Sequence, residues 1–131
     1  MTRLTIVAAA GLLSAALASA QASDWSHPRR FDVTLSNFDF TPSSIHLKAG
    51  EPTDIHIVNA SGSRHNFSAK AFFAAASMNE ASKAAVRDGT VEVPGKGTID
   101  IVLIPRAGRY KLKCTHTFHT TFGMKGEIIV D

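Results

Sequence analysis

Four residues of this 131-residue chain have side chains that suit a single metal ion. Cys114 is the only cysteine, four residues separate it from His119, and four more separate His119 from Met124. His65 lies far upstream, in the separate segment 64–67. The two sulfur ligands favour Cu(I), imidazole suits Cu(II), and a trigonal arrangement with a weak axial sulfur accepts both states. These residues are therefore predicted to bind one copper ion that alternates between Cu(I) and Cu(II).

Three of these residues share a short loop between two predicted strands. Apolar and polar residues alternate over 110–114 and again over 127–130, as expected for strands with one buried face. Such a loop can bring several side chains to one point. His65, from a distant segment, would attach that point to the body of the fold.

The pattern Cys-x4-His-x4-Met-Lys-Gly, with the upstream pair His65-Asn66, resembles the cupredoxins. Its spacing is similar to that of the azurin, auracyanin and rusticyanin branches. Segments 38–42 and 47–50 also resemble the early strands of this family. The resemblance covers nearly the whole chain after residue 22, and it implies a blue copper protein that carries single electrons.

The resemblance also implies a role for each residue of the site. His65, Cys114 and His119 would form the plane around copper, with Met124 as the weak axial ligand. Asn66 and Thr115, each directly after a ligand, match family positions that join the two ligand segments through hydrogen bonds. Without these neighbours, both would be interpreted as polar turn residues.

His116 is an alternative ligand, because it lies two residues after the cysteine. A third imidazole at copper would displace Met124 and give a more tetragonal site. We favour His119, because Met124 then falls at the spacing found in the family. The histidines at 46 and 56 each lie between two apolar residues of a predicted strand, so we expect both on the surface.

Residues 1–22 are predicted to be a signal peptide. They begin with Arg3, continue through an apolar, alanine-rich stretch, and end in small residues that suit cleavage after Ala20 or Ala22. Residues 23–131 are predicted to form one domain, and no later segment could span a bilayer. The expected location is the periplasm. Exported proteins seldom keep an unpaired cysteine, and metal binding would explain Cys114.

The remaining pattern predicts an all-β fold. Short alternating segments separated by proline and glycine turns indicate a two-sheet Greek-key sandwich or barrel. Residues 69–88 contain no proline or glycine and are rich in alanine, and they predict one inserted helix of about four turns. Ser68 could cap its start and Gly89 could close its end.

Two classes of function fit these features. The first is an electron carrier, which the complete ligand set and the compact single domain favour; its partners would be cytochromes or reductases in transient complexes, and its state a monomer. The second is a copper-handling protein that sequesters or delivers the metal. An enzyme is not expected, because four protein ligands leave no open position for a substrate. Once Arg3 is removed with the signal, 13 basic residues face 11 acidic ones, and the scattered basic residues predict no nucleic-acid partner.

Overall fold

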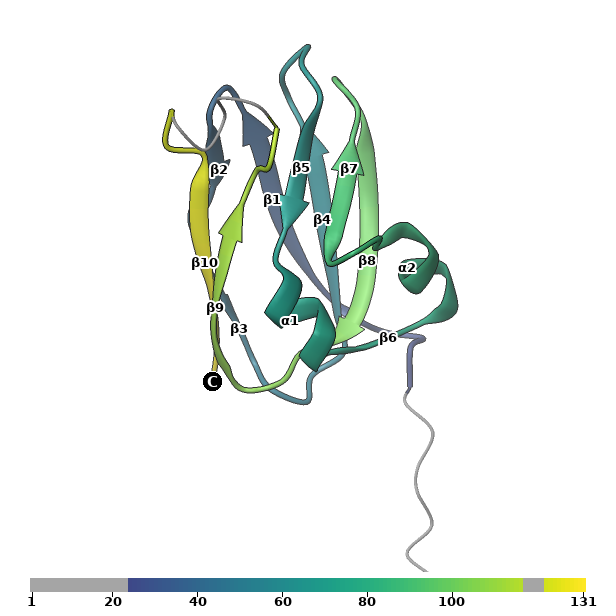
Figure 1. Cartoon of the computed structure of the whole chain (residues 1–131). Helices are drawn as coiled ribbons and strands as arrows, with labels where there is room; N and C mark the ends of the chain where they lie inside the picture. Colours follow the sequence, from purple (N-terminus) through teal and green to yellow (C-terminus); the bar gives the residue numbers. More distant parts are fainter. Residues whose placement is uncertain (1–23, 117–121) are drawn as a thin grey trace, which may run out of the picture.

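The computed structural model describes residues 24–116 and 122–131, which form a sandwich of two β-sheets (Figure 1). Sheet A has the strand order β2-β1-β4-β8-β6, and sheet B has the order β3-β10-β9-β5-β7. The all-β prediction is confirmed. The predicted signal peptide at residues 1–22 and the predicted ligand His119 lie outside the described residues.

The chain crosses repeatedly between the two sheets. Sheet A contains β1 (Arg29–Ser36), β2 (Asp39–Thr41), β4 (Thr53–Asn59), β6 (Ser77–Met78) and β8 (Thr98–Ile104). Sheet B contains β3 (Ser44–Leu47), β5 (His65–Ser68), β7 (Thr90–Val93), β9 (Gly108–Lys113) and β10 (Lys125–Val130). The pairs β1–β4 and β3–β10 are parallel, and the other pairs of these strands are antiparallel. Such crossing is typical of Greek-key sandwiches.

The core lies between the sheets and follows the alternation of the sequence. Side chains at every second position of each long strand point inward, and full burial of one such side chain contributes about 1.5–3 kcal/mol. The buried apolar residues from sheet A include Val33, Leu35, Phe40, Ile55, Ile57, Ile101 and Leu103, and those from sheet B include Ile45, Leu47, Phe67, Val91, Val93, Leu112, Ile128 and Val130. The strand prediction therefore also identified most of the core.

The helical insertion differs from the prediction. Instead of one helix over 69–88, the structure has α1 (Lys70–Ala75) and α2 (Glu80–Ala85), with β6 between them. The backbone becomes extended at Ala76, and β6 then pairs with the edge of β8. Alanine-rich composition reports helix propensity, but it carries no information on this tertiary pairing, so the prediction of a single helix was wrong.

The predicted caps of that helix also need correction. Ser68 does not cap α1; its hydroxyl lies 2.9 Å from the hydroxyl of Thr90 on β7. Asn79 caps α2 instead, since its side-chain oxygen accepts a hydrogen bond from the backbone N–H of Ser82.

Neither helix approaches the length or apolarity that a membrane span needs, and no other helix in residues 24–116 and 122–131 does.

Candidate metal centre

Three neighbouring strands of sheet B place the predicted ligands. His65 begins β5, Cys114 directly follows β9, and Met124 directly precedes β10, and the sheet order β10-β9-β5 makes these strands adjacent. Each of the three residues continues the inward-facing alternation of its strand, two positions from Phe67, Leu112 and Gly126 respectively. All three side chains are fully buried, at 0% exposure. Alternation thus turns the three predicted ligands into the sandwich.

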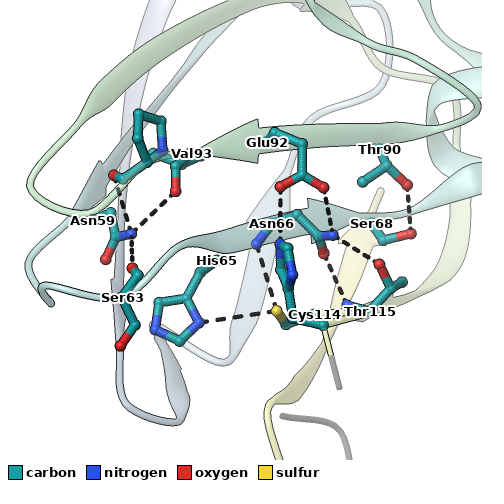
Figure 2. A network of polar contacts seen from close by, with 12 residues as sticks. Asn59, Ser63, His65, Asn66, Ser68, Thr90, Glu92, Val93, Cys114 and Thr115 are labelled. Atoms are coloured by element: carbon teal, nitrogen blue, oxygen red, sulfur yellow. Dashed lines mark hydrogen bonds and ion pairs between the residues drawn. The ribbon is translucent and has the colours of Figure 1, made fainter. Parts of the chain in front are cut away.

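His65 and Cys114 face one another, as Figure 2 shows. The His65 Nδ1 atom lies 3.9 Å from the Cys114 Sγ atom. On the far side of the ring, His65 Nε2 lies 2.8 Å from the side-chain oxygen Oδ1 of Asn37. An amide oxygen only accepts, so this bond requires the proton on Nε2 and leaves the lone pair of Nδ1 directed toward the sulfur. His65 is therefore oriented as a metal ligand.

The backbone also supports the sulfur and joins it to the methionine. The backbone N–H of Asn66 donates to Cys114 Sγ over 3.5 Å. The backbone N–H of Cys114 donates to the carbonyl oxygen of Met124 over 3.1 Å. The two ends of the ligand loop are thus held together by a main-chain bond.

Asn66 connects the two ligand segments, as the resemblance to the cupredoxins predicted. Its side-chain amide donates to the Thr115 hydroxyl over 2.7 Å, and its side-chain oxygen accepts from the backbone N–H of Thr115 over 2.8 Å. This prediction is confirmed. The same amide also donates to a carboxylate oxygen of Glu92 over 2.9 Å (Figure 2). The residues flanking the two predicted ligands therefore form one hydrogen-bonded unit.

Glu92, on β7, also contacts the alternative ligand. Its second carboxylate oxygen lies 2.9 Å from Nε2 of His116. Burial alone would raise the pKa of Glu92. The hydrogen bonds from Asn66 and His116 lower the pKa by more than burial raises it, so the pKa lies below the usual value. Glu92 thus remains a carboxylate that anchors both Asn66 and His116.

The described residues contain only part of the predicted ligand set. They bring together His65, Cys114 and the backbone of Met124, whereas His119 lies in the segment 117–121 outside the description. Within the described ranges, no group of three or more His, Cys, Asp or Glu side chains could hold a metal ion. The four-ligand set is therefore still a prediction.

The two donors that are present fit one ion. A nitrogen and a sulfur bind one zinc ion at about 2.0 and 2.3 Å, and with such bonds at a trigonal angle of about 120° they would lie about 3.7 Å apart. The observed separation of 3.9 Å is close to that value. An imidazole and a thiolate, with the thioether of Met124 as the predicted axial donor, match the donors that copper accepts in both oxidation states.

Two residues of this region could not be identified from the sequence. Asn37 and Glu92 contact His65 and Asn66 respectively, from strands or loops far away along the chain. The only available signal for Glu92 was its outward position between Val91 and Val93. Its register opposite Asn66 becomes known only once β5 and β7 are paired.

An aromatic pair lies next to His65. Phe38 meets the His65 ring edge-on, with a centroid distance of 6.4 Å, and stacks on Phe122 at 5.1 Å. Phe122 is 65% exposed and is the large apolar residue most open to solvent in the described chain. The rings of Phe38 and Phe122 therefore connect His65, a predicted ligand, to an exposed apolar surface.

Comparison with known proteins agrees with this fold. A family model described as a cupredoxin-like domain matches residues 6–130. No curated protein sequence matches the chain.

Several solved structures have a similar fold. Auracyanin A, a blue copper protein from Chloroflexus aurantiacus, is 18% identical with a TM-score of 0.57, and the match covers 80% of this chain and 100% of that chain. The dithionite-reduced auracyanin of Roseiflexus castenholzii is 17% identical with a TM-score of 0.58, covering 78% and 96%. McoA, a multicopper oxidase from Aquifex aeolicus, is 17% identical with a TM-score of 0.63, but the match covers 85% of this chain and only 31% of the oxidase. At these levels of sequence identity, the comparisons show that this chain shares its fold with these proteins.

Proposed function

Because this chain belongs to the cupredoxin family, we propose that it is a blue copper protein that carries single electrons between partner proteins in the periplasm. The observation that carries the proposal is the buried pair of His65 Nδ1 and Cys114 Sγ, 3.9 Å apart and each supported by its own hydrogen bond. His119 and Met124 complete the proposed ligand set. The periplasmic location rests on the predicted signal peptide at residues 1–22.

Copper, when bound, supplies the one-electron couple between Cu(I) and Cu(II). The protein holds its donors in nearly fixed positions. Asn37 orients the His65 ring, the Asn66 amide supports the thiolate of Cys114, and the burial of both donors keeps water away. A site that changes little between oxidation states lowers the reorganisation that accompanies electron transfer.

The choice of His119 as the second imidazole rests on its spacing from Cys114 and Met124. His116 Nε2 is 2.9 Å from a carboxylate oxygen of Glu92. The Nε2 atom of His65 makes a similar contact with Asn37, so this contact does not decide between His116 and His119.

We propose a carrier without catalytic activity, because the four proposed ligands leave no position open for a substrate. The exposed face of Phe122, stacked on Phe38 beside His65, offers a small apolar contact for brief encounters with a partner. Redox complexes of this kind have small interfaces and dissociate quickly. The proposed partners are cytochromes or reductases, and the proposed state is a monomer.

Addition of one equivalent of Cu(II) to the reduced apoprotein tests the copper assignment. We expect an intense visible absorption from charge transfer between the Cys114 thiolate and copper. Cys114→Ser should abolish the band, whereas Ser68→Ala, a substitution on the same sheet outside the proposed ligand set, should retain it. A nearly colourless wild-type complex would show that the assignment is wrong.

The carrier and copper-handling functions can be separated on one preparation. A carrier should exchange electrons rapidly between its Cu(I) and Cu(II) forms and should release copper slowly to an acceptor protein or chelator. Rapid copper release combined with slow electron self-exchange would overturn the carrier function in favour of copper handling.

A further inference from the structure

A basic groove is lined by residues of β5, α1 and β9. It has a volume of about 450 Å³. Its lining residues are Ser68, Lys70, Ala71, Arg109, Tyr110, Lys111 and Lys113. More than half of these residues carry a positive charge, so the groove concentrates cations in a way that the nearly balanced composition of the chain does not predict.

The positive charge of the groove is poorly neutralised. All 11 carboxylate side chains of the sequence lie in the described residues, and only two of them form ion pairs with the groove cations. Asp88 lies 3.4 Å from Lys70, and Glu127 lies 3.4 Å from Arg109, in pairs that are largely exposed. Exposed pairs of this kind contribute little energy. Within residues 24–116 and 122–131, Lys111 and Lys113 form no ion pair.

Strand register adds to this concentration of charge. Alternation places Arg109, Lys111 and Lys113 on the same outer face of β9; on β10, Lys125 lies directly opposite Lys113 and Glu127 lies directly opposite Lys111. Like charges opposite each other across two strands destabilise a sheet. The carboxylates of β1, β4 and β8 lie on the other side of the sandwich, where they cannot offset this cost; they are Asp32, Asp54 and Asp100.

The groove adjoins the predicted copper site. Lys113 directly precedes Cys114, and Lys125 directly follows Met124. A partner held by these lysines would therefore lie next to two of the proposed ligands. Charge complementarity mainly accelerates and orients such an encounter, which suits a transient redox complex.

We propose that this basic groove is a docking site for a carboxylate-rich surface of a protein partner. The identity of that partner as a redox protein rests on the proposed function. A protein surface is favoured over an anionic membrane because the cations line a concavity, into which acidic side chains can reach and against which a flat bilayer cannot pack closely.

The test uses the Cu(I)-loaded protein, which is diamagnetic, and hexaglutamate as an acidic probe at low ionic strength. Titration followed by NMR should shift the backbone amide signals of Lys70, Ala71, Lys111 and Lys113. The double variant Lys111→Glu/Lys113→Glu should bind hexaglutamate about tenfold more weakly. The control variant Lys48→Glu/Lys83→Glu, with the same change in net charge at exposed positions outside the groove, should bind like the wild type.

Three results would overturn the proposal: no shifts with hexaglutamate, an equal loss of affinity in the control variant, or binding to phosphatidylglycerol vesicles without binding to the peptide. If the glutamate variant unfolds, the affinity of Lys111→Gln/Lys113→Gln for hexaglutamate provides a second test, because this variant removes the charges without introducing repulsion. Peptide binding and the visible copper band are independent measurements. A protein that develops the band but ignores the peptide retains the proposed function and loses only the docking site.

Discussion

The Cys114 sulfur receives support from a segment that lies far away in the sequence. The backbone N–H of Asn66 donates to it, and the ring of His65 faces it at 3.9 Å. Both contacts come from β5, whereas the cysteine follows β9. The chemistry of this one atom therefore depends on the pairing of two strands that the sequence separates widely.

At the same scale, two histidines of the ligand loop should respond differently to truncation. His119→Ala should remove a ligand from the copper plane, change the visible and paramagnetic spectra strongly, and weaken copper binding by at least about a hundredfold. His116→Ala should leave the copper geometry nearly unchanged, because the spacing of the loop assigns the second imidazole to His119. Absorption and electron paramagnetic resonance spectra of both variants check this expectation.

The opposite outcome would identify His116 as the ligand. Strong changes in both variants would instead indicate a site with three imidazoles. Either result contradicts the proposed ligand set.

Gly126 shows how a single position controls strand pairing. A Cβ atom at Gly126 would lie well inside contact distance of the Ser43 carbonyl oxygen, which accepts a hydrogen bond from the backbone N–H of Glu127 over 2.8 Å. Gly126→Ala should therefore force β10 away from the start of β3 and destabilise the fold by about 2–3 kcal/mol. Chemical denaturation measures this loss.

Gly62→Ala provides the matched control, because a Cβ atom there would have no neighbour within 4 Å. It should change the free energy of unfolding by less than about 0.5 kcal/mol. Equal stability of the two variants would show that β3 and β10 are not as closely packed as the structure has them.

Asp54, on the outer face of sheet A, should make the free energy of unfolding depend on pH. Asp54 is half-buried and its Oδ1 atom has no hydrogen-bond partner in the described structure. Burial, the negative charge of Asp100 and a hydrogen bond to Asp100 raise the pKa of Asp54. A carboxyl group with a raised pKa stabilises the fold most below the unfolded-state pKa of about 3.9, and this contribution is lost as the pH rises through the folded-state value.

Asp54→Asn should therefore stabilise the protein at pH 7, by an amount on the order of 0.5 kcal/mol because solvent screens the partly exposed group. At pH 3 the gain should disappear. Thermal unfolding at both pH values measures the difference, with Asp39→Asn, the same change at an exposed position, as the control. A gain that is the same at pH 3 and pH 7 would contradict this account.

At the scale of these elements, the sequence predicts strands much better than helices. The alternation around Ile55 and Ile57, or around Ile101 and Leu103, reflects burial between two sheets, and burial is a local property of the pattern. The insertion at 69–88 was different, because its division into α1 and α2 depends on the pairing of β6 with β8. Pairing between distant segments leaves little trace in a short window of sequence.

The same distinction applies to the site. His65, Cys114 and Met124 could be identified by residue type and spacing, and Asn66 and Thr115 by their resemblance to family positions. Asn37 and Glu92 could not, because an isolated asparagine or glutamate in a polar segment has many uses. Their contacts with His65 and Asn66 become apparent only when the strands are assembled.

For the molecule as a whole, metal binding and folding should be linked. The proposed ligands come from β5 and from the segment between β9 and β10, so copper would bind the native state far better than the unfolded chain. A free metal concentration a thousand times the dissociation constant stabilises the native state by about 4 kcal/mol. In a domain of this size, we expect the melting temperature to fall by more than about 10 °C when copper is removed.

Differential scanning calorimetry of the loaded and copper-free forms measures this change. Cys114→Ser should remove most of the difference between the two forms. Identical melting temperatures of the loaded and copper-free wild type would show that copper does not bind the native fold preferentially.

The position of β10 determines when such a site can come into existence. In sheet B, β10 lies between β3 and β9, and it follows both of them in the sequence. Until β10 has left the ribosome, β3 lacks the strand beside it and Met124 cannot accept the bond from the Cys114 amide. A nascent chain therefore cannot assemble the centre from its earlier strands, and it acquires a place for the metal only once β10 has emerged.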